Sequence, residues 1–425
     1  MAGTNRISTR EKMRRKYRYV DRSFILFLLT LFQVVSFTPV IFADGEIHFK
    51  VAFMLLGYIL FEWIYVTFMH NVVKKINFEL ELIAFFLSGI GLCLTASVNE
   101  DSMLKQMITV LGGVIVYDIL LWYLKDVKRV MAIRPFLMAF TLIFFAGAFL
   151  YIYKFVGAIN GAYNWIRLGG ITVQPSEFVK IAFVFVGAAT LDKLLTSKNI
   201  YLYIGFAMGC IGILFLMKDF GTALIFFFTF IVIAFMRSGD VRSIIFICVA
   251  AVIGAVLILY FRPHVMARFE NYRHVWDDPY GRGYQQTRVL MYAVSGGLQG
   301  LGVGNGKLRH VYASTTDLVF GMICEEMGIL IAVAIVVAFA FIAIYAVKSS
   351  KSAPSTFYSI SACSAAAMIL FQTCLNIFGI TDLLPLTGVT LPFISQGGSS
   401  MVCCWALFAF IKAADIRAYP KMYKT

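Results

Sequence analysis

Charged residues are scarce in this chain. Only 14% of its 425 residues are Asp, Glu, Lys or Arg, whereas a soluble domain carries about 25%. Hydrophobic residues make up 60% of the sequence, and the mean hydropathy is +0.82. A chain with so few polar side chains cannot cover itself with a polar surface. The composition therefore excludes an ordinary soluble protein and predicts one that folds in lipid.

Motifs for metal, nucleotide and nucleophilic chemistry are also missing. The eight cysteines lie mainly in apolar stretches, with no CxxC pair or Cys/His cluster at metal-ligand spacing, which favours small buried apolar residues. No HExxH or GxSxG motif occurs. The glycine run at 296–306 follows no βαβ strand and lacks a Gly-Lys-Ser/Thr ending, which excludes a P-loop. Those glycines are expected to allow tight turns and close backbone approach.

Long apolar runs are what the sequence has in abundance. We expect an all-α, polytopic membrane protein with about twelve transmembrane helices, each needing about 20 apolar residues. The tenth run is long, which indicates a helix that tilts or begins outside the hydrocarbon. The runs lie near 24–42, 51–70, 78–97, 103–123, 135–156, 177–196, 200–217, 220–236, 243–261, 317–347, 357–378 and 398–413.

The net charge of +14 gathers in the N-terminal tail and in alternate short loops. This distribution obeys the positive-inside rule and predicts a multi-pass protein with both termini in the cytoplasm. The basic tail is expected to contact anionic membrane lipids. No nucleic-acid partner is expected. No small-residue cleavage site stands out after the tail, so we expect no cleavable signal peptide.

Two predicted outer segments, 157–176 and 262–316, are longer than the other connections, and long loops are often functional. The second segment is rich in Arg, Tyr, Gly and Gln and is basic overall. A basic loop beside a membrane would attract an anionic substrate such as a pyrophosphate. The alternative is a solvated loop with no such role.

Ionisable residues within or beside the predicted spans are the most informative feature, because they are costly in lipid and usually face a cavity, partner or substrate path. Glu177 and Lys180 open the sixth span three residues apart, so they share a helix face and can pair. We expect Glu325 and Glu326 in the same helix as Asp317, two turns after it. The ionisable residues at the predicted outer ends of spans are Glu177, Lys180, Asp219, Asp317, Glu325 and Glu326.

A structural role is the alternative for each of these residues. Asp317 follows Ser314-Thr315-Thr316 and would also suit a helix N-cap. Several ionisable residues at outer span ends favour one polar cavity that opens outward. Partial burial raises the pKa of a carboxyl group towards neutrality, which suits general-base catalysis.

A series of short motifs runs from about Leu87 to Phe410. They are Leu94-Thr95-Ala96-Ser97, Asn164-Trp165-Ile166-Arg167, Gln174-Pro175-Ser176-Glu177-Phe178-Val179-Lys180, Asp219-Phe220-Gly221-Thr222, Gly283-Tyr284-Gln285, Thr316-Asp317-Leu318-Val319-Phe320, Glu325-Glu326-Met327-Gly328, Leu391-Pro392-Phe393-Ile394-Ser395 and Gly397-Gly398-Ser399-Ser400. In the order and spacing of these motifs, the sequence resembles the SEDS family of bacterial cell-wall proteins (RodA, FtsW, SpoVE).

The resemblance implies a peptidoglycan glycosyltransferase that polymerises lipid II at the outer face of the bacterial cytoplasmic membrane. A class B penicillin-binding protein would be its transpeptidase partner, in cell elongation, division or sporulation. Asp317 occupies the position of the family's essential acidic residue and would deprotonate the acceptor sugar hydroxyl or otherwise assist its attack. Undecaprenyl pyrophosphate would leave, and basic residues of the large loop, such as Arg268, would stabilise its charge.

The resemblance also implies a group of substrate-binding residues, but it does not establish whether the reaction uses a cofactor. A divalent cation, Mg²⁺ or Mn²⁺, could help the pyrophosphate leave, although the sequence shows no dedicated site for one. The substrate-binding residues implied are Arg167, Glu177, Lys180, Asp219, Arg268, Gln285, Glu325, Glu326, Ser395 and Ser399.

The sequence departs from the family pattern in ways that indicate a divergent branch. The family's His before Thr-Asp is Thr315, and the Leu-Pro a few residues before it is Tyr312-Ala313. The Gln-Pro-Asp motif is Lys218-Asp219 without the proline, and the Tyr of Ser-Tyr-Gly-Gly is Gln396. Two predicted helices precede the usual ten. The expected organisation is a basic tail at 1–23, two added helices at 24–77, a ten-helix body at 78–413 and a C-terminal tail at 414–425.

Two other functions fit the sequence. A transporter that moves lipid-linked precursors would also need buried charge pairs and a cavity. A non-catalytic scaffold for a penicillin-binding protein would need neither. Retention of Asp317, Glu177 and Lys180 favours an enzyme over a scaffold, and an outward-facing site favours polymerisation over flipping.

Overall fold

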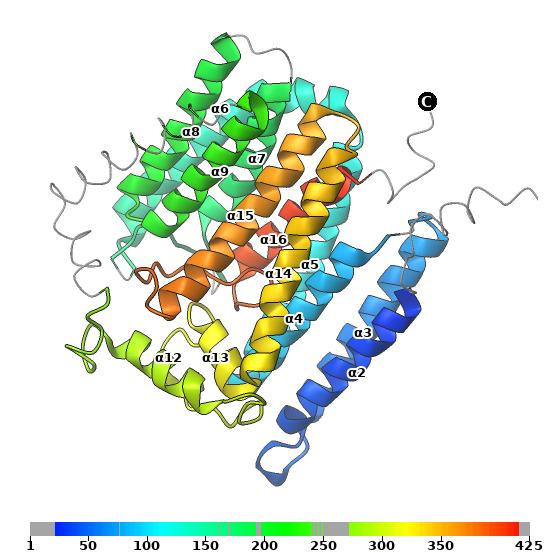
Figure 1. Ribbon diagram of the computed structural model, residues 1–425, viewed down its shortest axis with the longest axis vertical. Coiled ribbons are helices and arrows are strands. Elements are labelled where there is room, and N and C mark those ends of the chain that lie inside the picture. Colours follow the sequence, from blue (N-terminus) through cyan, green and yellow to red (C-terminus); the bar gives the residue numbers. More distant parts are fainter. Residues whose placement is uncertain are drawn as a thin grey trace, which may run out of the picture.

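The computed structural model describes residues 22–75, 77–159, 161–168, 171–192, 197–239 and 272–415, together with Arg242, Ile245 and Val249. Long helices of alternating direction form a bundle, and one small hairpin is the only sheet within these residues (Figure 1). Eight of the described helices are long and apolar enough to cross a membrane. The prediction of an all-α polytopic membrane protein is therefore confirmed.

The bundle helices lie close to the predicted apolar runs. The ninth predicted span, 243–261, lies almost entirely outside the described residues, so the count of twelve stays a prediction. In chain order the bundle helices are α2 (Arg22–Ile41), α3 (Phe49–Asn71), α4 (Glu79–Val98), α5 (Glu100–Leu124), α6 (Val127–Tyr151, continued by the π-helical turn Ile152–Val156), α7 (Pro175–Asp192), α8 (Ser197–Leu216), α9 (Phe220–Ser238), α14 (Gly328–Lys351), α15 (Thr356–Ile380) and α16 (Gly398–Ala413).

The predicted tenth span is wrong in one respect, because it is two helices and not one. The short helix α13 (Val319–Glu326) ends at Met327, and α14 begins at Gly328, whose φ is +82°. A left-handed residue cannot continue a right-handed helix. A Cβ on Gly328 would also lie 2.4 Å from the carbonyl oxygen of Leu298. Asp317 therefore sits in a turn before α13, and the two glutamates end α13 instead of lying inside the spanning helix.

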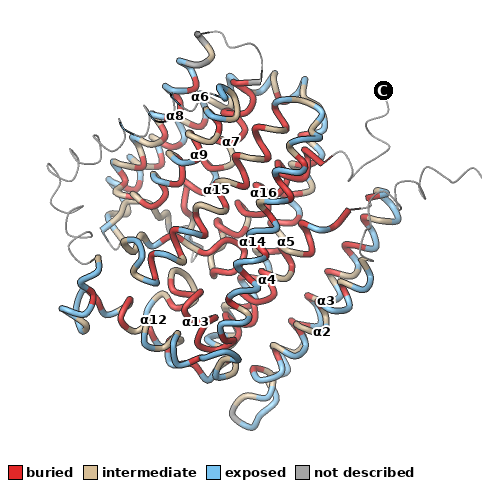
Figure 2. Tube along the Cα trace, viewed as in Figure 1, coloured by how far each residue is buried: buried red, intermediate tan, exposed pale blue. Residues whose placement is uncertain are grey.

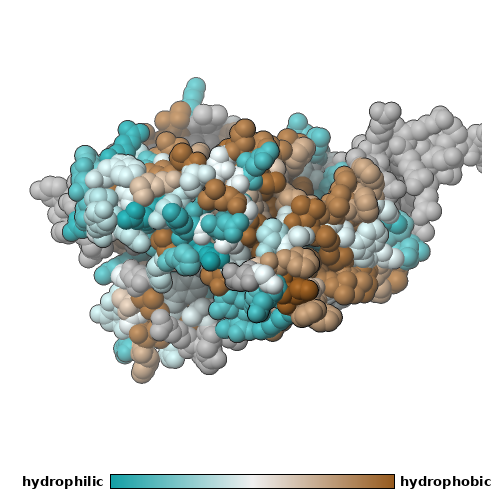
Figure 3. Space-filling model, turned by 90° about the horizontal axis from the view of Figure 1, so that it is seen from below, coloured by the Kyte–Doolittle hydropathy of each residue, from teal (hydrophilic) through white to brown (hydrophobic). Residues whose placement is uncertain are grey.

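One end of the bundle carries the long connections, and we call it the loop end. It comprises the described residues of 157–174 (157–159, 161–168 and 171–174) together with 217–219, 272–318 and 381–397, and the hairpin of β1 (Ile166–Leu168) and β2 (Ile171–Val173) lies in the first segment. Helix α12 (Tyr284–Ser295) lies across this end, at the bottom of Figure 1. Seen from below, hydrophilic residues gather over much of this end (Figure 3). The positive-inside pattern predicts that it faces outward.

The centre of the bundle is built around α16. Every residue of α16 from Cys403 to Ala413 is buried, and α4, α5 and α15 pack around it (Figure 2). Gly113 allows α5 to approach, because a Cβ there would lie only 2.6 Å from Cδ1 of Trp405. Small residues at helix contacts are the usual means of close packing in membranes.

Helices α2 and α3 form a hairpin at the edge of the bundle (Figure 1). Between them, Gln33 Nε2 donates to Glu62 Oε1 over 2.8 Å, and both side chains are buried. Where α3 and α5 begin, His48 Nδ1 lies 2.5 Å from Glu100 Oε1. Cys93 of α4 donates to the carbonyl oxygen of Ser36. Specific polar contacts therefore fix this hairpin to α4 and α5.

Candidate functional site

Asp317 lies in a turn at the loop end and is half-buried. Burial raises the pKa of its carboxyl group to about 6, and a hydrogen bond from the Thr316 hydroxyl opposes the rise. Its Oδ2 lies beside Gly388, where an added Cβ would be 3.5 Å away. A carboxyl group with a pKa near neutrality can both accept and return a proton at physiological pH.

Two amide side chains of α15 support the Asp317 turn. Asn376 Nδ2 donates to the carbonyl oxygens of Asp317 and Val389, both over 2.8 Å. One turn earlier, Gln372 Nε2 donates to the carbonyl oxygen of Thr390 over 2.9 Å. Sequence reasoning missed both amides. Their signal was a Gln and an Asn four residues apart in an apolar span, which places them on one helix face.

Ser395 fastens the other side of the same turn. Its hydroxyl donates to the carbonyl oxygen of Thr316 over 2.5 Å and accepts from the backbone N–H of Leu391 over 2.8 Å. The structure thus brings Ser395 next to Asp317, as a residue that holds the turn through its backbone.

The predicted pair of Glu177 and Lys180 is confirmed at the start of α7. Lys180 Nζ lies 2.8 Å from Glu177 Oε1 and donates to Gln372 Oε1 over the same distance. Gln372 therefore joins the ion pair to the segment beside Asp317. Glu177 Oε2 and Asn376 Oδ1 are buried with no hydrogen-bond partner among the described residues. Buried acceptors normally bond to protein, water or ligand, so these two atoms mark candidate contacts for a polar substrate.

Asp219 and Ser399 hold the segment between α6 and α7. Asp219 Oδ1 accepts from the backbone N–H of Thr222 and so caps α9. Its Oδ2 accepts from Gln174 Nε2 over 2.9 Å and from Asn164 Nδ2 over 3.1 Å. The Ser399 hydroxyl accepts from the backbone N–H of Gln174. Asp219 is thus engaged within the protein. Arg167 lies in β1, paired with Thr172 of β2.

Glu325 and Glu326 bind the glycine-rich segment of the large loop. Glu325 accepts from the backbone N–H groups of Lys307 and Leu308, over 2.7 and 2.9 Å, and Glu326 accepts from that of Gly304 over 2.9 Å. Burial raises the pKa of the Glu326 carboxyl group to about 7, against the Gly304 hydrogen bond. The two carboxylates therefore order this segment.

The close approach expected of the glycines occurs here. A Cβ on Gly300, whose φ is +84°, would lie 2.2 Å from the carbonyl oxygen of Glu326. Only glycine fits this position without movement of the backbone.

Two further predicted residues belong to the large loop. Gln285 Nε2 donates to the carbonyl oxygen of Tyr312 over 3.0 Å, which ties α12 to the start of the Asp317 turn. Arg268 lies outside the described residues. Among the described residues, no group of three or more His, Cys, Asp or Glu side chains could hold a metal ion. The divalent cation stays a prediction.

Comparison with known proteins identifies the family. A family model described as a cell cycle protein, FtsW/RodA/SpoVE, matches residues 82–419. The chain belongs to the FtsW/RodA/SpoVE family. Stage V sporulation protein E of Bacillus subtilis is 31% identical over 253 residues, which cover 57% of this chain and 68% of that protein. The peptidoglycan glycosyltransferase RodA of Mycobacterium tuberculosis is 27% identical over 330 residues, covering 74% of this chain and 70% of that protein.

Two solved structures share the fold. RodA of Thermus thermophilus superposes with a TM-score of 0.60 at 20% identity, covering 84% of this chain and all of that one. A chain from a structure on the coordination of polymerization and crosslinking by a peptidoglycan synthase complex gives a TM-score of 0.66 at 20% identity, covering 82% and 99%. The family match begins at residue 82, so α2 and α3 precede it.

Two departures from the family pattern meet in this structure. The Thr315 hydroxyl donates to Gln396 Oε1 over 2.8 Å, and the Gln396 backbone N–H donates to the carbonyl oxygen of Thr315 over 2.8 Å. Thr315 stands two residues before Asp317, and Gln396 follows Ser395. The residues that replace the family's His and Tyr therefore form one contact beside the family's acidic position.

Proposed function

We propose that this chain is a peptidoglycan glycosyltransferase that uses lipid II as donor and acceptor. The observation that carries the proposal is the half-buried Asp317 carboxyl group, with a pKa of about 6, held at the loop end by Asn376 and by the loop of Ser395. Curated relatives named peptidoglycan glycosyltransferases support the reaction.

In the proposed reaction, Asp317 accepts the proton of the acceptor sugar hydroxyl. The resulting oxygen nucleophile attacks the anomeric carbon of the donor, a new glycosidic bond forms, and the bond to the lipid pyrophosphate breaks. Positive charge beside the departing pyrophosphate stabilises the transition state. The large loop supplies cations such as Arg288, which lies over the rings of Tyr280 and Tyr284.

The site would face the outside of a bacterial cytoplasmic membrane, with both termini in the cytoplasm. The loop distribution of Lys and Arg supports this orientation. A class B penicillin-binding protein is the proposed partner that crosslinks the product. The likeness to a chain from a structure concerned with both polymerization and crosslinking supports such a partnership.

The test is glycan synthesis by the purified full chain with its cognate transpeptidase and lipid II, followed by gel separation of the products. Wild type should make glycan strands, and Asp317→Ala should make none. Asp277→Ala is a matched control, because Asp277 is an exposed acidic residue of the same loop end. Equal product from Asp317→Ala would remove the role given to Asp317. Absence of product from wild type, with partner binding intact, would favour the scaffold.

A lipid-precursor transporter is the second candidate, and the buried pair of Glu177 and Lys180 favours it, because ion pairs at membrane depth often line a transport path. Proteoliposomes that contain fluorescent lipid II would separate the two functions. A transporter would expose inner-leaflet lipid II to an external quencher without glycan synthesis, whereas a polymerase would consume the lipid without exchange between leaflets.

A further inference from the structure

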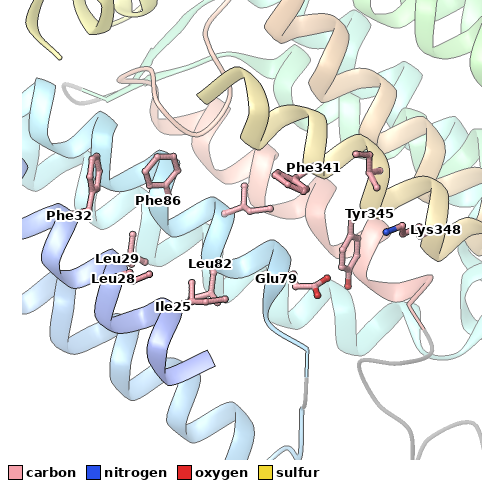
Figure 4. Close-up of a pocket in the computed structure, with 12 residues that line it drawn as sticks. Ile25, Leu28, Leu29, Phe32, Glu79, Leu82, Phe86, Phe341, Tyr345 and Lys348 are labelled. Carbon is pink, nitrogen blue, oxygen red and sulfur yellow. The ribbon is translucent and has the colours of Figure 1, made fainter. Parts of the chain in front are cut away.

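An apolar groove lies between α2, α4 and α14, away from the proposed catalytic site. Its volume is about 700 Å³. Ile25, Leu28, Leu29 and Phe32 of α2 form one side of it (Figure 4). Phe86 of α4 and Phe341 of α14 are among the residues of the other two helices that line it.

The groove opens towards the lipid. Leu28, Phe341 and Ile344 line it and are 45%, 56% and 48% exposed. All three lie within helices that can span the membrane. Hydrocarbon must therefore fill the groove in a bilayer. Because lipid chains outside the groove are equally apolar, burial alone gives no selectivity for one lipid over another.

The charged end of the groove is where selectivity can arise. Glu79 of α4 and Lys348 of α14 line it beside Tyr345 (Figure 4). Both charged residues are exposed, and neither side chain forms a hydrogen bond or ion pair within the described part of the chain. They lie where α4 begins and α14 ends, at the end of the bundle opposite the loops, which is the level of lipid headgroups.

We propose that this groove binds one phospholipid whose headgroup carries a phosphate and a primary ammonium group. The acyl chain lies along the groove, Lys348 binds the phosphate, and Glu79 binds the ammonium group. Lysine is a common phosphate ligand. A headgroup with a phosphate and no ammonium group would leave Glu79 without its partner charge and would be repelled by it.

A membrane-spanning helix of another protein fits the groove less well. Such a helix occupies roughly 2,400 Å³, taken as a cylinder about 10 Å wide and 30 Å long. The groove, with a volume of about 700 Å³, is too small to enclose such a helix, whereas a single acyl chain can lie within it. The two opposite charges at one end also match a zwitterionic headgroup.

The site depends on the segment before the family match. Helix α2 and Glu79 both precede residue 82, where the match begins. The proposal therefore gives helix α2 a function that is separate from polymerisation: it completes a binding site for a lipid of the surrounding membrane.

Native mass spectrometry of the purified full chain would test the proposal. The protein is incubated with equal amounts of phosphatidylethanolamine and phosphatidylglycerol, and the fraction that retains one lipid is measured. Wild type should retain phosphatidylethanolamine preferentially. Lys348→Gln should lower its retention about fivefold, the effect of one lysine near a lipid surface. Glu79→Gln should abolish the preference for phosphatidylethanolamine.

Two matched controls separate the site from general effects. Lys351→Gln removes an exposed lysine one turn further along α14 and should change nothing. Leu28→Trp with Ile344→Trp should fill the groove and remove the bound lipid, whereas Ile64→Trp, on a lipid-facing position of α3, should not. Equal retention of both lipids by wild type, or lipid retained by the filled groove, would overturn the proposal. Displacement of the lipid by a membrane-spanning partner would assign the groove to a protein helix instead.

Discussion

Thr315 and Gln396 bind each other through two hydrogen bonds, although they are 81 positions apart in the chain. One bond joins the side chains and the other joins the backbones. Together with Ser395, which binds the carbonyl oxygen of Thr316, they fasten the 391–397 loop to the two residues before Asp317. The carboxyl group therefore takes its position from a segment that folds against it from far along the sequence.

This contact predicts coupled effects on catalysis. Thr315→Val and Gln396→Leu each remove the bond between the side chains, and each should lower kcat by a factor of about 2 to 13, as expected for ~0.5–1.5 kcal/mol. KM for lipid II should change little, because neither side chain is proposed to bind substrate. Steady-state rates of glycan synthesis give both constants.

A double-mutant cycle isolates the contact. The double variant should be no slower than either single one, and Thr315→Ser, which keeps the hydroxyl, should restore the rate. Thr381→Val is the matched control, because its hydroxyl at the same end bonds only to its own helix. Fully additive losses in the double variant would contradict the positioning role.

The pKa of Asp317 predicts the pH dependence of the reaction. A general base must be deprotonated, so the rate should rise with pH and level off above about 6. Thr316→Val removes the hydrogen bond that lowers the pKa of Asp317, so the pH at which the rate reaches half its maximum should increase. Initial rates of glycan synthesis between about pH 5 and 8 measure this midpoint.

Glu326 provides the control for this profile. The pKa of its carboxyl group is about 7, so it titrates in the same range without touching the proposed reaction. Glu326→Gln should leave the rise of the rate near pH 6 in place, and loss of this rise in that variant would assign it to Glu326.

The stability of the protein should depend on pH in the opposite direction to the rate. The pKa of Asp317 in the folded protein is raised above its ordinary value of 3.8, so the contribution of Asp317 to the free energy of unfolding is lost as pH rises from about 4 to 6.

Asn376 predicts a combined loss of stability and activity. Asn376→Leu removes both donors to the carbonyl oxygens of Asp317 and Val389, and two buried acceptors left unpaired should cost about 2–4 kcal/mol. Thermal unfolding in detergent and the rate of glycan synthesis would both fall. Thr373→Val, a buried change on the same helix whose hydroxyl bonds to the carbonyl oxygen of Ile369, should leave the rate unchanged. A normal rate in Asn376→Leu would show that Asp317 needs no support from α15.

The long helices could be predicted from the sequence because lipid imposes one rule on each of them: an apolar run of sufficient length. The run at 398–413 became α16 with the same bounds. Glu325 and Glu326 interrupt the apolar run just before Gly328, but hydropathy does not show that one helix ends there and another begins. The cause of this break is a contact with residues 298–300, which only the folded loop brings into place.

The candidate site was predictable as a set of residue types and not as a set of roles. Asp219, Glu325 and Glu326 are carboxylates at helix ends, as the sequence indicated, but each accepts backbone N–H groups of this chain. In a sequence, a carboxylate that orders a loop cannot be told from one that faces a substrate, because both occur as acidic residues at the end of an apolar run. Gln372 and Asn376 were overlooked because neutral amides do not interrupt an apolar run.

Gly328 yields the last prediction, which concerns stability. Gly328→Ala places a Cβ 2.4 Å from the carbonyl oxygen of Leu298 and forces a left-handed backbone on alanine, so the free energy of unfolding should fall by more than about 1–2 kcal/mol. The Asp317 turn and α13 would shift with it, because α14 begins at this residue. Gly212→Ala in α8 is the matched control, since a Cβ there meets no atom within 4 Å. Thermal unfolding in detergent should show a lower Tm for Gly328→Ala alone, and equal Tm values for both variants would mean that the backbone at 328 can adopt another conformation without cost.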